Sequence, residues 1–162
     1  MSKNRDDRHP TEKSKRPQCK DLSPLEVTII SFGYKEGAPP PANVIFDVRF
    51  LKNPFWVEEL RPLTGMDRPV QEYVLQQPLA DDFLNSVVKL MENLLPRLVE
   101  LKIPDFTIAF GCTGGQHRSA TMVEALSDRL SQLYPQYSIL RQHRELAPPA
   151  GAGLSRTVTA ED

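Results

Sequence analysis

A chain of 162 residues fits one domain of ordinary size and can bury a core without metals or disulfides. The formal net charge of −1 excludes a whole-protein field that would draw the chain to nucleic acid or a membrane. Two cysteines exclude a disulfide framework, and no apolar run is long enough to cross a bilayer, so we expect a cytoplasmic protein without a membrane partner.

The two ends of the chain lack the apolar residues that a folded core needs. Residues 1–23 are rich in Lys and Arg, and we expect either a disordered solubilising tail or a basic arm for RNA or another polyanion. Residues 146–162 are rich in Pro, Gly and Ala and predict a second disordered tail. The globular domain is therefore expected over 24–145.

The globular part alternates β-rich runs with helical patterns. Apolar and β-branched runs predict strands near 27–33, 44–46, 106–110 and 138–140. Between the second and third runs we expect an irregular excursion over 51–65, a short helix capped by Asp67, and a long helix from Leu79 that Pro96 kinks or ends. A last helix is expected from Arg118 to Tyr134. The pattern predicts one layered α/β domain, with a four-stranded, mostly parallel or mixed sheet flanked by helices.

The most informative segment is Gly111-Cys112-Thr113-Gly114-Gly115-Gln116-His117-Arg118-Ser119, which joins a strand to a helix. Glycines let consecutive backbone N–H groups point into the loop, and the helix adds its free N–H groups and the positive end of its dipole. Arg118 can grip two oxygens at once, and Thr113, His117 and Ser119 add donors. The segment predicts a loop that binds a phosphate-like anion.

An enzymatic interpretation of the same loop is open. Cys112, five residues, Arg118 and Ser119 resemble the phosphate loop of cysteine-dependent phosphatases, in which the thiolate attacks phosphorus. Asp67 or Asp105 would then be the proton donor. The alternatives are a buried structural thiol at Cys112, an Arg118 that caps a carboxylate, and a His117 that only bonds the helix start. The loop lacks the Lys of the GxxxxGK[ST] motif, which argues against ATP hydrolysis.

Further polar residues follow the other predicted strands. Lys35 follows the first strand, Asp47 and Arg49 the second, and His143 and Arg144 the last. Because ligands bind beyond the carboxyl ends of parallel strands, Arg49, His143 and Arg144 could surround the Arg118 loop. The alternative for each is a solvated charge or a salt bridge such as Asp47 with Arg49. No metal site or cofactor is expected.

Several ordered motifs carry a resemblance to a known family. They are Ser31-Phe32-Gly33-Tyr34-Lys35, Phe46-Asp47-Val48-Arg49-Phe50, Asn53-Pro54, Leu60-Arg61-Pro62-Leu63-Thr64-Gly65 and the glycine loop. Over roughly 25–145 the chain resembles the C-terminal domain of the RapZ-type RNase adapter family. Members usually add an N-terminal P-loop NTPase half, which this sequence does not contain, so the resemblance does not imply nucleotide binding here.

The resemblance implies a pocket for an amino-sugar phosphate, glucosamine-6-phosphate, together with RNA-adapter duties. By motif the pocket residues would be Asp47, Arg49, Cys112, Thr113, Gly114, Gly115, His117 and Arg118. The chain departs from the family at Phe55, where a His is frequent, and in a C-terminus that is not basic.

We therefore expect a binding or sensor domain for a phosphorylated small molecule, with a regulatory or RNA-adapter role. RNA, a protein partner and homo-oligomerisation remain open. The alternative is a cysteine-dependent phosphatase that uses Cys112 and Arg118.

Overall fold

The computed structural model of the chain describes residues 24–147 and contains one four-stranded sheet. The strands are β1 (Glu26–Gly33), β2 (Val44–Asp47), β3 (Asp105–Cys112) and β4 (Ser138–His143). They lie in the order β2-β3-β1-β4, and every neighbouring pair is parallel. The predicted α/β class with four strands is confirmed, and the sheet is fully parallel. The predictions for 1–23 and 148–162 lie outside the described residues.

The two inner strands are the most apolar ones. Ile29 of β1 lies in register with Ile108 of β3, and both side chains are fully buried. The middle strands of a parallel sheet are largely buried, which is why their sequences contain nearly continuous apolar runs. The shorter strand β2 and the more polar strand β4 form the two edges.

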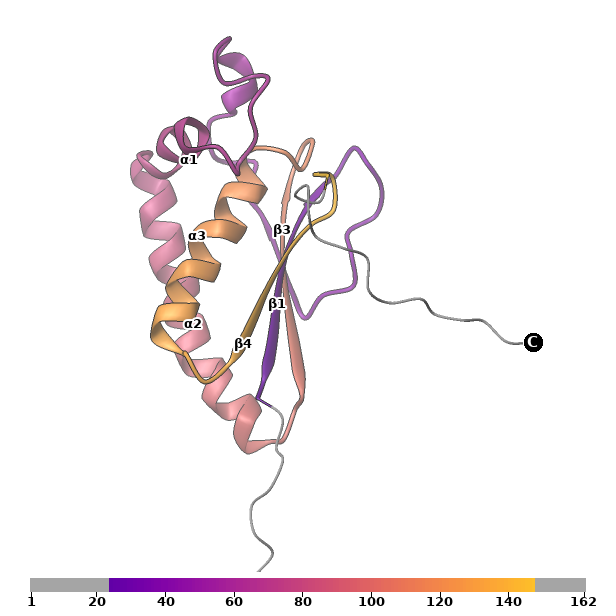
Figure 1. Cartoon of the computed structure of the whole chain (residues 1–162), viewed down its shortest axis with the longest axis vertical. Coiled ribbons are helices and arrows are strands. Elements are labelled where there is room, and N and C mark those ends of the chain that lie inside the picture. The colour runs from indigo at the N-terminus through magenta and orange to yellow at the C-terminus, as the bar shows by residue number, and fades with distance from the viewer. Residues whose placement is uncertain (1–23, 148–162) are drawn as a thin grey trace, which may run out of the picture.

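Three helices cover one side of the sheet (Figure 1). They are α1 (Arg68–Leu75), α2 (Pro78–Glu100) and α3 (Arg118–Leu133). Helix α3 packs against β1, β3 and β4, while Phe83 of α2 contacts the rings of Phe46 and Phe110 on the sheet. Within residues 24–147, no helix combines the length and apolar character that a membrane span requires.

Two local predictions need correction. Of the two outcomes expected at Pro96, a kink or an end, the end is wrong, because helix α2 continues to Glu100. Pro96 is exposed, whereas Leu95 beside it is fully buried, so packing of the apolar face outweighs the hydrogen bond that proline removes. Asp67 does occupy the N-cap position of α1, but its carboxylate accepts from the Thr64 amide at 2.8 Å instead of capping the helix.

The connections leave the carboxyl ends of β1 and β3 in opposite directions. After β3 the chain enters α3 on the helical side, whereas after β1 it runs along the other side of the sheet (Figure 1). Adjacent parallel strands whose connections diverge leave a crevice between their ends, which is where ligands bind in open α/β sheets. The fold therefore opens a crevice between the loop after β1 and the glycine loop.

Candidate functional site

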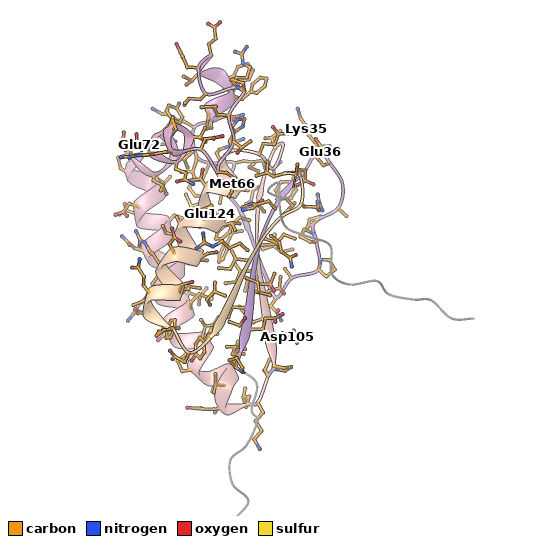
Figure 2. All side chains as sticks on the ribbon, in the orientation of Figure 1. Lys35, Glu36, Met66, Glu72, Asp105 and Glu124 are labelled. Atoms are coloured by element: carbon orange, nitrogen blue, oxygen red, sulfur yellow. The ribbon has the colours of Figure 1, made fainter. Side chains whose placement is uncertain are left out.

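A pocket of about 610 Å³ lies in this crevice. Six of the predicted site residues line it, and these are Arg49, Cys112, Thr113, Gly114, His117 and Arg118. Another six residues complete the lining: Lys35, Glu36, Asn53, Phe55, Trp56 and Gln116. Figure 2 shows Lys35 and Glu36 at the carboxyl end of the sheet. The structure thus gathers two thirds of the predicted set around one hollow, together with residues from the loop after β1 and the excursion after β2.

Gly115 shapes the loop without lining the pocket. Its φ of +72° is in the left-handed region that favours glycine. A Cβ at this position would stand 2.6 Å from the Gly33 nitrogen and 2.5 Å from Glu145 Oε2. Glu145 also accepts from the Gly33 amide at 2.8 Å. The loop is therefore braced from behind by the end of β1 and by the residues that follow β4.

The backbone of the loop keeps its donors free. Among the hydrogen bonds within residues 24–147, none uses the amide N–H groups of Gly114 to Ser119 as donors. Two carbonyls of the same stretch accept hydrogen bonds, Gln116 from the Gly65 amide at 2.7 Å and His117 from the Thr121 amide at 2.9 Å. Free amides at the start of α3 provide the partial positive charge that an anion needs.

Arg118 is the most deeply placed charge of the pocket, with 5% of its surface exposed. Its Nη1 donates to the carbonyls of Leu51 at 2.9 Å and Arg49 at 3.1 Å, and its Nη2 donates to Thr113 Oγ1 at 3.2 Å. The Nε is buried and has no partner within the described residues. No carboxylate is among these partners, so within residues 24–147 the Arg118 guanidinium forms no salt bridge beside the pocket.

His117 is the N-cap residue of α3. Its carbonyl accepts the hydrogen bond from the Thr121 amide, whereas its ring makes no capping bond. The residue is 8% exposed, and its Nε2 is buried without a partner among residues 24–147. A buried polar atom without a partner costs free energy, so His117 Nε2 and Arg118 Nε are two groups whose bonding capacity is unused among residues 24–147.

Asp47 and Arg49 form the ion pair that the sequence left as an alternative. Arg49 donates from Nε and Nη2 to the Asp47 carboxylate, at 3.0 and 2.7 Å, and its guanidinium lies 4.2 Å from the centre of the Tyr34 ring. The bond to Arg49 holds the pKa of Asp47 below its ordinary value, and burial raises the pKa of Tyr34, with Asp47 adding to the rise. Asp47 does not line the pocket, and among residues 24–147 Glu36 is the one carboxylate that does.

Cys112 ends β3 as a buried thiol. Its Sγ is 3.1 Å from Ser119 Oγ, and the residue is 2% exposed. The proton donors that a phosphatase would need lie elsewhere: Asp105 is at the opposite end of β3, as Figure 2 shows, and Asp67 is bonded to Thr64. Ser119 is fully buried behind the thiol. The geometry matches the structural alternative for Cys112 better than the nucleophilic one.

His143 and Arg144 do not join the Arg118 loop as expected. The His143 ring bridges Ser31 Oγ at 2.8 Å and Glu124 Oε1 at 2.9 Å, and Glu124 in turn accepts from Arg141 at 2.7 Å. Arg141 also pairs with Asp128. We call these five residues, Ser31, Glu124, Asp128, Arg141 and His143, the edge network. Arg144 instead donates to the Gly33 and Ala38 carbonyls.

Sequence reasoning missed Glu36, Trp56 and Gln116 as pocket residues. Gln116 is inside the loop that the sequence singled out, and Glu36 adjoins Lys35. Trp56 carried a signal that could have been used, because a tryptophan in an irregular, proline-rich segment has no strand or helix face to bury it. Within residues 24–147, no three His, Cys, Asp or Glu side chains come together as a metal site.

Comparison with known proteins identifies the domain. The family model described as the RapZ C-terminal domain matches residues 25–147. A nucleotide-binding protein of Shewanella sp. (strain ANA-3) is 46% identical over 123 residues, which are 76% of this chain and 43% of that protein. A nucleotide-binding protein of Acidothermus cellulolyticus is 49% identical over 109 residues, covering 67% of this chain and 35% of that protein. The chain spans less than half the length of these relatives. Because the family model covers more than half of it, the chain belongs to the RapZ C-terminal domain family.

Proposed function

We propose that this domain binds a phosphorylated small molecule in the pocket at the start of α3 and serves as a regulatory sensor or adapter domain. The observation that carries the proposal is the set of buried donors without partners, His117 Nε2 and Arg118 Nε, beside the free amides of the glycine loop. A phosphoryl group carries three oxygens that each accept hydrogen bonds, so it suits a cluster of unused donors.

An amino-sugar phosphate, with glucosamine-6-phosphate as the candidate, suits the rest of the lining. Glu36 lines the pocket, and within residues 24–147 its carboxylate takes part in no ion pair. It is therefore available to a ligand ammonium, whereas Asp47 is already engaged by Arg49. The relatives are named nucleotide-binding proteins, and the pocket provides the same phosphate chemistry for a nucleotide, so nucleotides belong in the test as competitors.

Calorimetric titration with glucosamine-6-phosphate tests the proposal. We expect Arg118→Ala to weaken binding by about 2–5 kcal/mol, because a charged contact in a desolvated pocket is lost. Arg129→Ala is the matched control, since Arg129 bonds Asn85 and Asp81 on the helical side. Tight binding that survives Arg118→Ala would refute the assigned site. Glucose-6-phosphate, which lacks the ammonium group, should bind more weakly than the amino sugar if Glu36 contacts that group.

A further inference from the structure

Helix α2 carries a second row of mostly apolar side chains beside the row that the core buries. The second row recurs at steps of three or four residues, which on a helix places side chains along one face. We call it the α2 stripe, and its residues are Leu79, Phe83, Ser86, Leu90, Leu94, Arg97 and Leu101. Leu79, Leu90 and Leu101 are 56%, 40% and 53% exposed. Large apolar side chains that gather in one exposed row indicate contact with another surface.

The α2 stripe lies on the flank of α2 that faces away from α3. On the opposite flank, Arg129 of α3 donates to Asp81 and Asn85. On the stripe side, Phe83 contacts the rings of Phe46 and Phe50, with centres 5.6 and 5.2 Å apart. Phe46 belongs to the edge strand β2, and α2 runs the length of the sheet (Figure 1). The stripe therefore lies along one outer edge of the domain.

A groove of about 340 Å³ lies at the N-terminal half of the stripe and is lined by Phe50, Leu79, Asp82, Phe83 and Ser86. Phe50 is 47% exposed. Asp82 is exposed and takes part in no ion pair within residues 24–147. Apolar walls with one unpaired carboxylate suit a side chain that has an apolar stem and a positive head.

The α2 stripe complements itself in the antiparallel direction. In a pair of helices related by a two-fold axis, residues that face each other lie equally far before and after the axis. With the axis at Leu90, Leu79 faces Leu101 of the other copy, and the small Ser86 faces the larger Leu94. The remaining pair places the Arg97 guanidinium at the Phe83 ring, one residue from the unpaired Asp82. Every facing pair of the stripe is thus compatible in size and charge.

We propose that two copies of the chain pair through the α2 stripe, with their α2 helices antiparallel about Leu90. Arg97 of each copy enters the groove of the other and pairs there with Asp82. Arg97 bonds Glu100 of its own helix at 2.9 Å, but both side chains are 64% exposed, and such a pair stabilises little and exchanges readily. In this arrangement the two pockets lie at opposite ends of the pair. The inference goes beyond the proposed function and does not depend on it.

Sedimentation equilibrium of the full chain tests for the pair and for its location. We expect a monomer–dimer equilibrium. Leu90→Asp should raise its dissociation constant at least about thirtyfold, because it removes the central apolar contact and brings two carboxylates together at the axis. Val99→Asp is the matched control, since Val99 is 44% exposed and lies half a turn around α2 from Leu90. A chain that is monomeric at every concentration, or a dimer that the two substitutions weaken equally, overturns the inference.

An exchange of charges tests the antiparallel orientation. Asp82→Arg and Arg97→Asp should each weaken the dimer at least about tenfold, because each places like charges together, and the double variant should recover the affinity. Circular dichroism of each variant checks that α2 remains folded. Arg118→Ala, which alters the pocket, should leave the dimer unchanged, so this result is separate from the phosphate titration. Weakening by both single substitutions without recovery in the double variant overturns the antiparallel pairing.

Discussion

The pocket lies between the end of β3 and the start of α3, and the edge network joins β1, α3 and β4. Both are polar clusters, yet they differ in how their donors and acceptors are used. In the edge network, His143 bonds through both ring nitrogens, and Arg141 is paired with two carboxylates. In the pocket, His117 and Arg118 keep buried nitrogens without partners among the described residues. A saturated cluster has nothing left to offer a ligand. Polar and charged side chains therefore indicate a binding site only where some of their donors or acceptors remain unused.

The largest expected effect is on the pocket, whose glycine loop should be distorted by a substitution at Gly115. Gly115→Ala places a Cβ 2.6 Å from the Gly33 nitrogen on a backbone with φ of +72°. The left-handed conformation alone costs a residue with a side chain about 1–2 kcal/mol, and the backbone clash adds to it. We expect at least about 2 kcal/mol of lost stability in urea unfolding, together with weakened phosphate binding.

Gly114→Ala serves as the matched control for this prediction. A Cβ at Gly114 meets no atom within 4 Å, and its φ is not positive. The free energy of unfolding should therefore change little. Equal destabilisation by the two substitutions would contradict the view that Gly115 alone carries the strained turn of the loop.

A pair of histidine substitutions sharpens the contrast. His143→Ala removes both bonds of its ring and leaves the fully buried Ser31 hydroxyl without this partner, so we expect a loss of about 1–3 kcal/mol in stability and no change in ligand affinity. His117→Ala should do the reverse and weaken phosphate binding by about 1 kcal/mol at a smaller cost in stability. Urea unfolding and calorimetry on the same preparations measure both quantities. If both variants lost stability and ligand affinity to the same extent, the distinction between the edge network and the pocket would be contradicted.

The smallest expected effect on stability concerns the ion pair of Asp47 and Arg49. Arg49 lines the pocket, but, like the residues of the edge network, it is already paired. The lowered pKa of Asp47, caused mainly by its bond to Arg49, means that the ionised carboxylate is favoured in the folded state. This stabilisation is present above the ordinary carboxyl pKa of 3.8 and is lost as the pH falls through the lowered pKa. For a half-exposed pair it should stay below about 1 kcal/mol.

Asp47→Asn checks this prediction through the pH dependence of unfolding. The variant should be slightly less stable than the parent chain at neutral pH, and the difference should disappear at the acid end. A difference that grows as the pH falls would contradict the assigned ion pair.

The sequence predicted those parts of the fold that depend on local pattern. The strands around Ile29 and Ile108 are nearly continuous apolar runs, and the start of α3 follows from the glycine loop. The alternative that Pro96 ends α2 was wrong, because the buried face of α2 determines the length of that helix and local propensity does not. The sequence indicated that Trp56 has no strand or helix face to bury it, but it did not indicate where the side chain lies. Its position depends on the path of the segment after β2, which Arg118 holds from a point 67 residues away in the chain.

The incompletely bonded Arg118 has a consequence for the stability of the domain in a cell. A buried charge with free donors is a cost that the unliganded fold carries, and an anion that binds only the folded chain relieves it. By mass action, a ligand at one hundred times its dissociation constant raises the free energy of unfolding by about 2.7 kcal/mol. The lifetime of the folded domain against proteolysis would then follow the concentration of its ligand, so that abundance as well as conformation could report the metabolite.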